Sequence, residues 1–194
     1  KDAKYVGDPI NAVKIFNEKE SDELIVLDID ATVEGREPDY KMIENLATEC
    51  RMPLCYGGGI KTVEQATRIF NLGVEKIALS SAVIENLKLV SDISKEVGSQ
   101  SVVVVIDVKK KMFGGYDVYT HNGTKKTNID LEKFIIELQS LGIGEIVINS
   151  IDNDGVMKGY DLSLIEKIKP LINVPMTVLG GAGTLEDINK LIEK

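Results

Sequence analysis

The chain has 194 residues, of which 43% are hydrophobic and 28% are charged, proportions that suit a soluble domain with a substantial core. Its net charge of −8 argues against a surface for nucleic acid or anionic membranes, and no apolar run approaches the roughly 20 residues that span a bilayer. The two cysteines, Cys50 and Cys55, form no Cys-x-x-Cys pattern, and His121 is the one histidine. We therefore expect no metal site, no cofactor and a reducing, cytoplasmic location.

Predicted helices and strands alternate along the chain. The pattern predicts helices at 9–18, 39–50, 62–72, 86–97, 130–141, 161–171 and 184–194, several of them opened by an Asp or Thr that can cap the first turn. Buried strands are predicted at 23–29, 53–56, 76–79, 101–107, 145–149 and 175–179. Between 108 and 128, the alternation of Tyr116–Thr120 and the turn at 121–123 predict a β-hairpin. Strands that alternate with helices indicate a parallel sheet in an α/β fold.

One sequence pattern occurs twice, 122 residues apart. Met52–Leu72 corresponds to Val174–Lys194, and each copy is a short apolar run, a glycine turn and a helix that begins after a Thr. Further matches at this offset fall at helix starts and strand starts: Asp8 with Asp130, Glu23 with Glu145, and Asp39 with Asp161. We interpret this repeat as a tandem duplication.

The duplication predicts a (β/α)₈ TIM barrel, because two half-units of four β/α repeats make eight. The strand at 101–107 has no first-half counterpart in this chain, and the strand at 76–79 has no second-half counterpart. We therefore predict a single, incomplete barrel domain over residues 1–194, built of duplicated half-barrels and lacking the first strand and the last β-α unit. The alternative is an open doubly wound sheet, but its Gly-x-Gly-x-x-Gly fingerprint is absent.

Asp107 is the predicted catalytic residue, since the active site of such a barrel lies at the carboxyl ends of its strands. It ends a run of four valines and an isoleucine and shares a strand face with Val105. A carboxylate in that low-dielectric mouth has a raised pKa, which suits a general acid or base. The simpler alternative is a carboxylate that caps the next loop or pairs with Lys109 or Lys110.

The glycine turns predict two phosphate sites, because bare backbone N–H groups between a strand and a helix can approach an anion. Two facing sites would suit a substrate with a phosphate at each end. The predicted substrate-binding and phosphate-binding residues all follow strands: Gly59, Ser80, Ser81, Asn149, Asp154, Gly155 and Gly181. The alternatives are glycines that only permit tight turns, and a calcium loop at 150–155, although the EF-hand spacing is not present.

Three charged residues, Glu23, Lys76 and Glu145, begin strands instead of ending them. They are therefore expected at the opposite, amino-terminal face of the barrel. They form either a functional layer or merely stabilising or solvated strand starts.

These motifs together resemble the HisF family, the cyclase subunits of imidazole glycerol phosphate synthase. The similarity covers nearly the whole chain and is carried by GDP at 7–9, DELIVLDI at 22–29, YGGGI at 56–60, GSQSVVVVIDVKK at 98–110, NSIDNDGVMKGYD at 149–161 and GGAG at 180–183. The resemblance implies a lyase/cyclase of histidine biosynthesis. A HisH-like glutaminase partner docks on the amino-terminal face and supplies ammonia through the barrel. The bisphosphorylated substrate, phosphoribulosyl-formimino-aminoimidazole carboxamide ribotide, becomes imidazole glycerol phosphate and an aminoimidazole carboxamide ribotide.

Residue roles also follow from the resemblance. Asp107 matches one of two catalytic aspartates, and the other belongs to the first strand. The matches to phosphate positions are Gly59, Ser81, Gly155 and Gly181. Glu23, Lys76 and Glu145 match three of the four charged residues of an ammonia gate, whose fourth member is an arginine of the first strand.

Four residues at the barrel mouth depart from the family pattern: Asp30, Ser80, Asn149 and Leu179. The combination of CYGGGI at 55–60, REPDY at 36–40 and SQSVVVVIDVKK at 99–110 resembles a HisF-like branch that supports acetamidino modification of surface-polysaccharide sugars. This branch is the second functional hypothesis. A non-catalytic ammonia conduit is the third.

Overall fold

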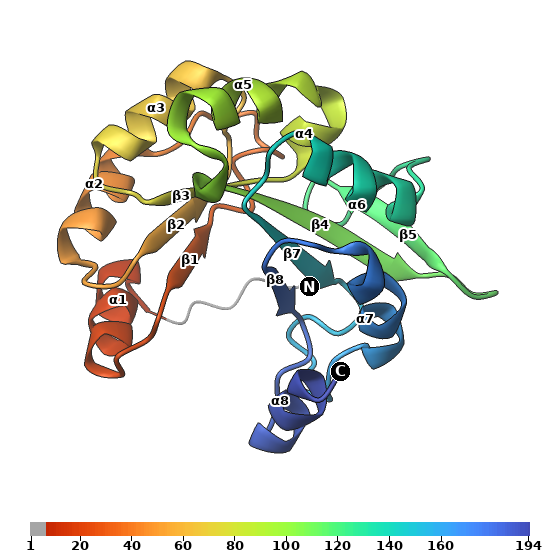
Figure 1. The fold of residues 1–194 in the computed structure, drawn as a ribbon. Helices are drawn as coiled ribbons and strands as arrows, with labels where there is room; N and C mark the ends of the chain where they lie inside the picture. The colour runs from red at the N-terminus through yellow and green to blue at the C-terminus, as the bar shows by residue number, and fades with distance from the viewer. Residues whose placement is uncertain (1–6) are drawn as a thin grey trace. The chain divides into compact units, whose positions relative to one another are not determined.

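The computed structural model describes residues 7–194, which divide into two compact units, one ending at Ala78 and the other beginning at Leu79. The first unit alternates helices with parallel strands (Figure 1): α1 (Pro9–Glu18), β1 (Leu24–Leu27), α2 (Tyr40–Glu49), β2 (Leu54–Gly57), α3 (Val63–Asn71) and β3 (Lys76–Leu79), the last of which reaches the boundary. In this sheet Leu24 lies opposite Leu54 and Cys55 lies opposite Lys76.

The second unit has three parallel strands and an antiparallel extension. It comprises α4 (Ser81–Glu85), α5 (Lys88–Val97), η1 (Ser99–Ser101), β4 (Val102–Lys110), β5 (Tyr116–Thr120), β6 (Lys125–Lys126), α6 (Leu131–Ser140), β7 (Glu145–Ser150), α7 (Leu162–Ile168), η2 (Lys169–Leu171), β8 (Met176–Leu179) and α8 (Leu185–Ile192). Strand β7 lies between β4 and β8, parallel to both, whereas β5 pairs antiparallel with β4 and with β6.

The predicted alternation of strands and helices is confirmed, with differences in several bounds. In the first unit, the buried strand predicted at 23–29 is limited to Leu24–Leu27, because a turn begins at Ile29, and its residues are half-buried or exposed. The strand expected to end at Asp107 continues to Lys110, because its outer residues pair with β5. Figure 1 shows this hairpin running out beyond β7. The helix expected at 161–171 ends at Ile168 and continues as η2, which contains Pro170, a residue without a backbone N–H for the helical ladder. The short helix α4 was not predicted.

The duplication is visible in backbone geometry. α1 and α6, like β2 and β8, have bounds 122 residues apart. The caps of α3 and α8, Thr62 and Thr184, have φ −137° in both copies and ψ of 160° and 163°, and both form capping boxes. The strand register repeats as well, since Leu24 faces Leu54 and Ile146 faces Met176. Each half therefore folds from the same local signals.

Each unit has its own apolar core between strands and helices. In the first unit the core includes Ile43, Ile69 and Ile77, all with no exposed surface. In the second unit Val103 and Ile146 of the sheet are equally buried, as β-branched residues are between a sheet and its covering helices.

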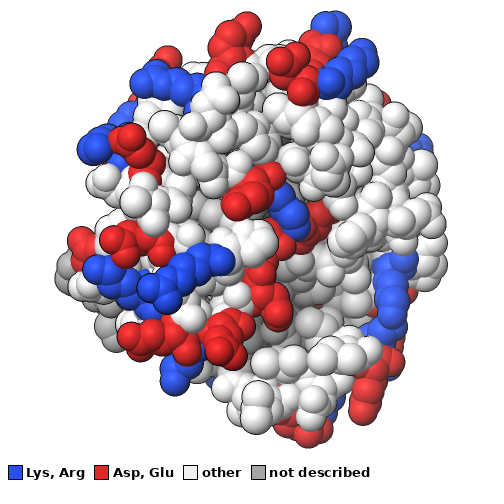
Figure 2. Space-filling view, turned by 60° about the vertical axis from the view of Figure 1, so that its left-hand side comes forward, with Lys and Arg blue, Asp and Glu red and all other residues white. Residues whose placement is uncertain are grey.

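Charged side chains of both signs are interspersed on the face shown in Figure 2, without one large patch of a single sign. Within residues 7–194, no helix has both the length and the apolar character of a membrane span.

Candidate functional site

Asp107 and Asn149 meet at the carboxyl ends of neighbouring strands. They face each other in the β4–β7 register, and the Asn149 side-chain amide donates a hydrogen bond of 2.8 Å to Asp107 Oδ1. The next strand places Leu179 opposite Asn149. Lys109 and Lys110, the partners considered for a merely structural Asp107, do not take this role: the Lys109 ammonium lies over the Tyr119 ring, and the Lys110 backbone N–H donates to Asp152.

The surroundings of Asp107 raise its pKa above that of an ordinary aspartate. Burial is the main cause, because it penalises the charged carboxylate. The hydrogen bond from Asn149 acts in the opposite direction, and the nearby charge of Asp154 raises the pKa further. A raised pKa makes the carboxyl group a better proton acceptor than an ordinary aspartate, which suits general acid–base chemistry.

The glycine turns are tight because a loop presses on each of them. A Cβ at Gly59 would lie 2.8 Å from the Arg36 carbonyl oxygen, and one at Gly181 would overlap the Gly159 carbonyl oxygen. Both glycines have positive φ, of 71° and 114°. The backbone conformation and the close neighbours therefore require glycine at both positions, whether or not a phosphate binds there.

The remaining predicted mouth residues of the second unit are held by short-range contacts. Ser81 is 7% exposed, and its hydroxyl oxygen accepts a hydrogen bond of 3.1 Å from the His121 backbone N–H. Ser80 precedes α4 and makes no side-chain cap to it. Asp154 and Gly155 belong to the loop after β7, whose Asp154 backbone packs against Gly180.

The charged strand starts have polar partners within each unit. In the first unit, Lys76 Nζ and Glu23 Oε2 form an ion pair of 2.8 Å. Glu23 Oε1 is buried and accepts no hydrogen bond from any residue that the structure describes. In the second unit, Glu145 is 6% exposed, and its Oε1 accepts a hydrogen bond of 2.6 Å from the Thr177 hydroxyl. The two glutamates correspond under the 122-residue offset, and so do Cys55 and Thr177.

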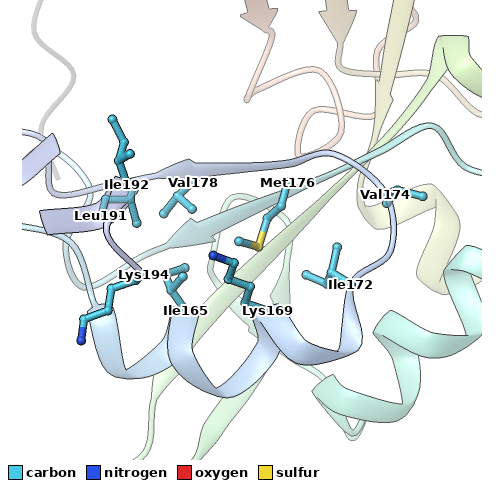
Figure 3. A pocket seen from close by; sticks show the side chains of 9 residues that line it. All are labelled: Ile165, Lys169, Ile172, Val174, Met176, Val178, Leu191, Ile192 and Lys194. Atoms are coloured by element: carbon cyan, nitrogen blue, oxygen red, sulfur yellow. The ribbon is translucent and has the colours of Figure 1, made fainter. Parts of the chain in front are cut away.

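A hollow of about 420 Å³ lies in the second unit beside β8 (Figure 3). Its lining is mainly apolar and comes from α7, η2, β8, α8 and their flanks: Ile165, Lys169, Ile172, Val174, Met176, Val178, Leu191, Ile192 and Lys194. The corresponding positions of the first unit, among them Leu54, Tyr56 and Ile69, are buried, and the strand that contains Leu54 and Tyr56 pairs with β3. This cavity is thus the flank of a strand and contains no part of the predicted reaction site.

Among residues 7–194, no group of three His, Cys, Asp or Glu side chains is placed to hold a metal ion.

Known proteins place the chain in a family. A family model described as histidine biosynthesis protein matches residues 1–194. A protein of Vibrio vulnificus (strain YJ016), provisionally named imidazole glycerol phosphate synthase subunit hisF3, is 62% identical over all of this chain and 75% of its own length. The chain belongs to the HisF family. The imidazole glycerol phosphate synthase subunit HisF of Sulfurisphaera tokodaii is 37% identical over 98% of the chain and 76% of that protein.

Membership of the HisF family confirms the predicted fold class, an α/β TIM barrel made of β/α units, and the predicted enzyme class, a HisF-type cyclase subunit. The family is also the one that the sequence motifs resembled. Its provisionally named members include a Leptospira borgpetersenii HisF protein, 58% identical over the whole chain and 76% of its own length.

The sequence did not identify the partner of Asp107. Asn149 was predicted as a mouth residue, but its hydrogen bond to Asp107 joins residues 42 positions apart. The Lys109–Tyr119 contact was missed too. The alternation of Tyr116–Thr120 could have revealed it, because a hairpin paired with β4 places an aromatic residue opposite Asp107.

Proposed function

We propose that this HisF-family chain is the cyclase of histidine biosynthesis. It would convert phosphoribulosyl-formimino-aminoimidazole carboxamide ribotide to imidazole glycerol phosphate, with ammonia from a HisH-like glutaminase. The observation that carries this proposal is Asp107, a largely buried carboxylate with a raised pKa at the end of a parallel strand. A proton must leave the attacking ammonia and another must reach a leaving group, and a carboxyl group that accepts and then returns a proton can perform both transfers.

Asn149 would hold the Asp107 carboxylate in one orientation. Its 2.8 Å hydrogen bond engages Oδ1, so Oδ2 is the oxygen that can meet the reacting atoms. Because Asn149 donates to the carboxylate, it also limits the rise in pKa that burial causes. Phosphate binding is proposed at Gly59, Ser81, Gly155 and Gly181, and further substrate contacts at Ser80, Asn149 and Asp154.

The ammonia gate is proposed at Glu23, Lys76 and Glu145. This proposal is supported by the Lys76–Glu23 ion pair and by the burial of Glu145. Partly buried charged groups need partners of opposite charge, and an exchange of such partners could open and close a gate. The unsatisfied Glu23 Oε1 also supports it, since a buried carboxylate oxygen calls for a further donor. That all these residues belong to one barrel domain is part of the same proposal.

The test is turnover of the ribotide by the complete protein with excess ammonium. We expect turnover, and Asp107→Asn should reduce it by on the order of a hundredfold or more, because the amide cannot exchange a proton. Ser150→Ala is a control at the neighbouring strand end. Absence of turnover by a folded protein, even with its glutaminase, would refute the proposal.

A second candidate function is the HisF-like branch of sugar amidation. The observation that favours it is the higher similarity to provisionally named relatives, 58% and 62%, than to the plainly named HisF proteins of Sulfurisphaera tokodaii and Exiguobacterium sibiricum, at 37% and 40%. Asn149 also stands where the family usually has Thr, directly beside Asp107. Glutamine-dependent ammonia delivery without ribotide turnover would favour this candidate.

A further inference from the structure

The β4–β5–β6 hairpin is strongly basic in an acidic protein. Residues 108–126 contain the five lysines Lys109, Lys110, Lys111, Lys125 and Lys126 and a single acidic residue, Asp117, whereas the whole chain has a net charge of −8. This segment begins directly after Asp107, and two of its lysines, Lys109 and Lys110, belong to β4, the strand that carries the proposed acid–base group. A local positive field of this kind attracts anionic ligands.

The strand register decides which lysines share a face with Asp107. Side chains two residues apart on a strand point to the same face, so Lys109 lies on the face of Asp107 and Lys110 on the opposite one. The pairing agrees, because Asp107 faces Tyr119 and Lys109 faces Asp117, whereas Lys110 faces Tyr116. Lys126 joins the first face by pairing with Tyr119.

The lysines of this face differ in their partners. Asp117 forms ion pairs with Lys111 at 3.3 Å and with Lys126 at 2.7 Å, so its charge is already shared between them. The Lys109 ammonium instead lies 5.9 Å from the centroid of the Tyr119 ring. Among the residues described, no carboxylate forms an ion pair with Lys109. An aromatic face holds a cation in place without cancelling its charge.

This arrangement keeps Lys109 close to Asp107 in the sheet without pairing the two. A direct ion pair would lower the pKa of Asp107, against the direction in which burial shifts it. Tyr119, the cross-strand neighbour of Asp107, holds the ammonium instead. Both groups thus remain available to a ligand on the same face.

We propose that Lys109 is a substrate-binding cation, which contacts a phosphate of the substrate while Asp107 acts on the reacting centre. This inference rests on the proposed function for the identity of the substrate, whereas the contact between Lys109 and a phosphate does not depend on it. The compact, strongly charged ammonium of lysine on a flexible stem suits a phosphate that arrives from solvent.

The experiment compares Lys109→Met with Lys110→Met in the complete protein, because the two neighbouring lysines carry the same charge on opposite faces. Lys109→Met should raise KM for the ribotide about tenfold or more, as loss of one charge-assisted hydrogen bond predicts, and change kcat by less than about threefold. Lys110→Met should stay within about twofold of wild type. Lys109→Arg should recover most of the lost affinity.

A binding measurement separates this inference from the proposed function. Inorganic pyrophosphate, titrated calorimetrically, should bind Lys109→Met about tenfold more weakly than wild type or Lys110→Met, whether or not the ribotide is turned over. Equal losses in the two methionine variants would indicate general electrostatic attraction and overturn the assignment, as would unchanged pyrophosphate binding in Lys109→Met. A wild type that binds pyrophosphate through Lys109 but turns over no ribotide would refute the proposed function alone.

Discussion

Gly59→Ala and Gly35→Ala form a matched pair that tests why the first glycine turn needs glycine. The two residues have nearly the same backbone conformation, with φ of 71° and 69°. A Cβ at Gly35 would meet no atom within 4 Å. A Cβ at Gly59 would lie 2.8 Å from the Arg36 carbonyl oxygen and 3.1 Å from the Pro38 nitrogen.

The expected costs follow from these surroundings. Both alanines adopt the left-handed region, which costs about 1–2 kcal/mol relative to glycine. Only Gly59→Ala must also displace the backbone at 36–38, and forcing extra volume into a packed site adds about 1–3 kcal/mol. We therefore expect Gly35→Ala to lower the free energy of unfolding by about 1–2 kcal/mol and Gly59→Ala by about 2–5 kcal/mol.

Urea denaturation followed by circular dichroism measures both losses. The denaturant slope and a second probe should be checked for coincidence, because the chain has two compact units and two-state unfolding is not assured. Equal losses in the two variants would refute the idea that the loop at 36–38 excludes a side chain at position 59.

Three further predictions concern charged residues. Because the folded-state pKa of Asp107 is raised, its charge lowers stability as pH rises through that pKa; Asp107→Asn should therefore raise the urea midpoint at pH 7, with the gain shrinking toward pH 4. Thr177→Val should lower the free energy of unfolding by about 1–3 kcal/mol by removing the hydrogen bond that the Thr177 hydroxyl donates to the buried Glu145 carboxylate, whereas Thr177→Ser should keep most of this stability. Lys76→Ala should change glutamine-dependent but not ammonium-dependent turnover, and equal effects in the two assays would exclude the gate.

Much of the fold could be predicted because the duplicated signals are local. Asp39 and Asp161 cap their helices with φ of −78° and −77°, and both Thr caps form the same box. Each signal needs only a side chain and the backbone two or three residues onward. Strand β3 was predicted with its observed bounds, Lys76–Leu79, since its residues form a short apolar run between turns.

Contacts between distant segments could not be predicted in the same way. The length of β4 depends on pairing with β5, and a period-2 pattern does not reveal where a partner strand ends. The hydrogen bond between Asn149 and Asp107 depends on the β4–β7 register, which brings together residues from different β/α units. The candidate site was thus predictable as a set of strand ends, but the partner of each residue was not.

The cost of Asp107 to the fold is the strongest physical argument that this residue acts in the reaction. An asparagine at the same position could accept the Asn149 hydrogen bond through its carbonyl oxygen, and it would avoid the penalty of a buried charge that raises the pKa of Asp107. Stability alone would therefore favour the amide. Unlike the amide, the carboxylate can gain and lose a proton. An ion pair with Lys109 would favour its charged form, but the Lys109 ammonium lies over the Tyr119 ring instead. Asp107→Asn should accordingly separate stability from catalysis, with higher stability at pH 7 and on the order of a hundredfold lower turnover. A variant that loses both would show that Asp107 has a structural role that the hydrogen bond to Asn149 does not explain.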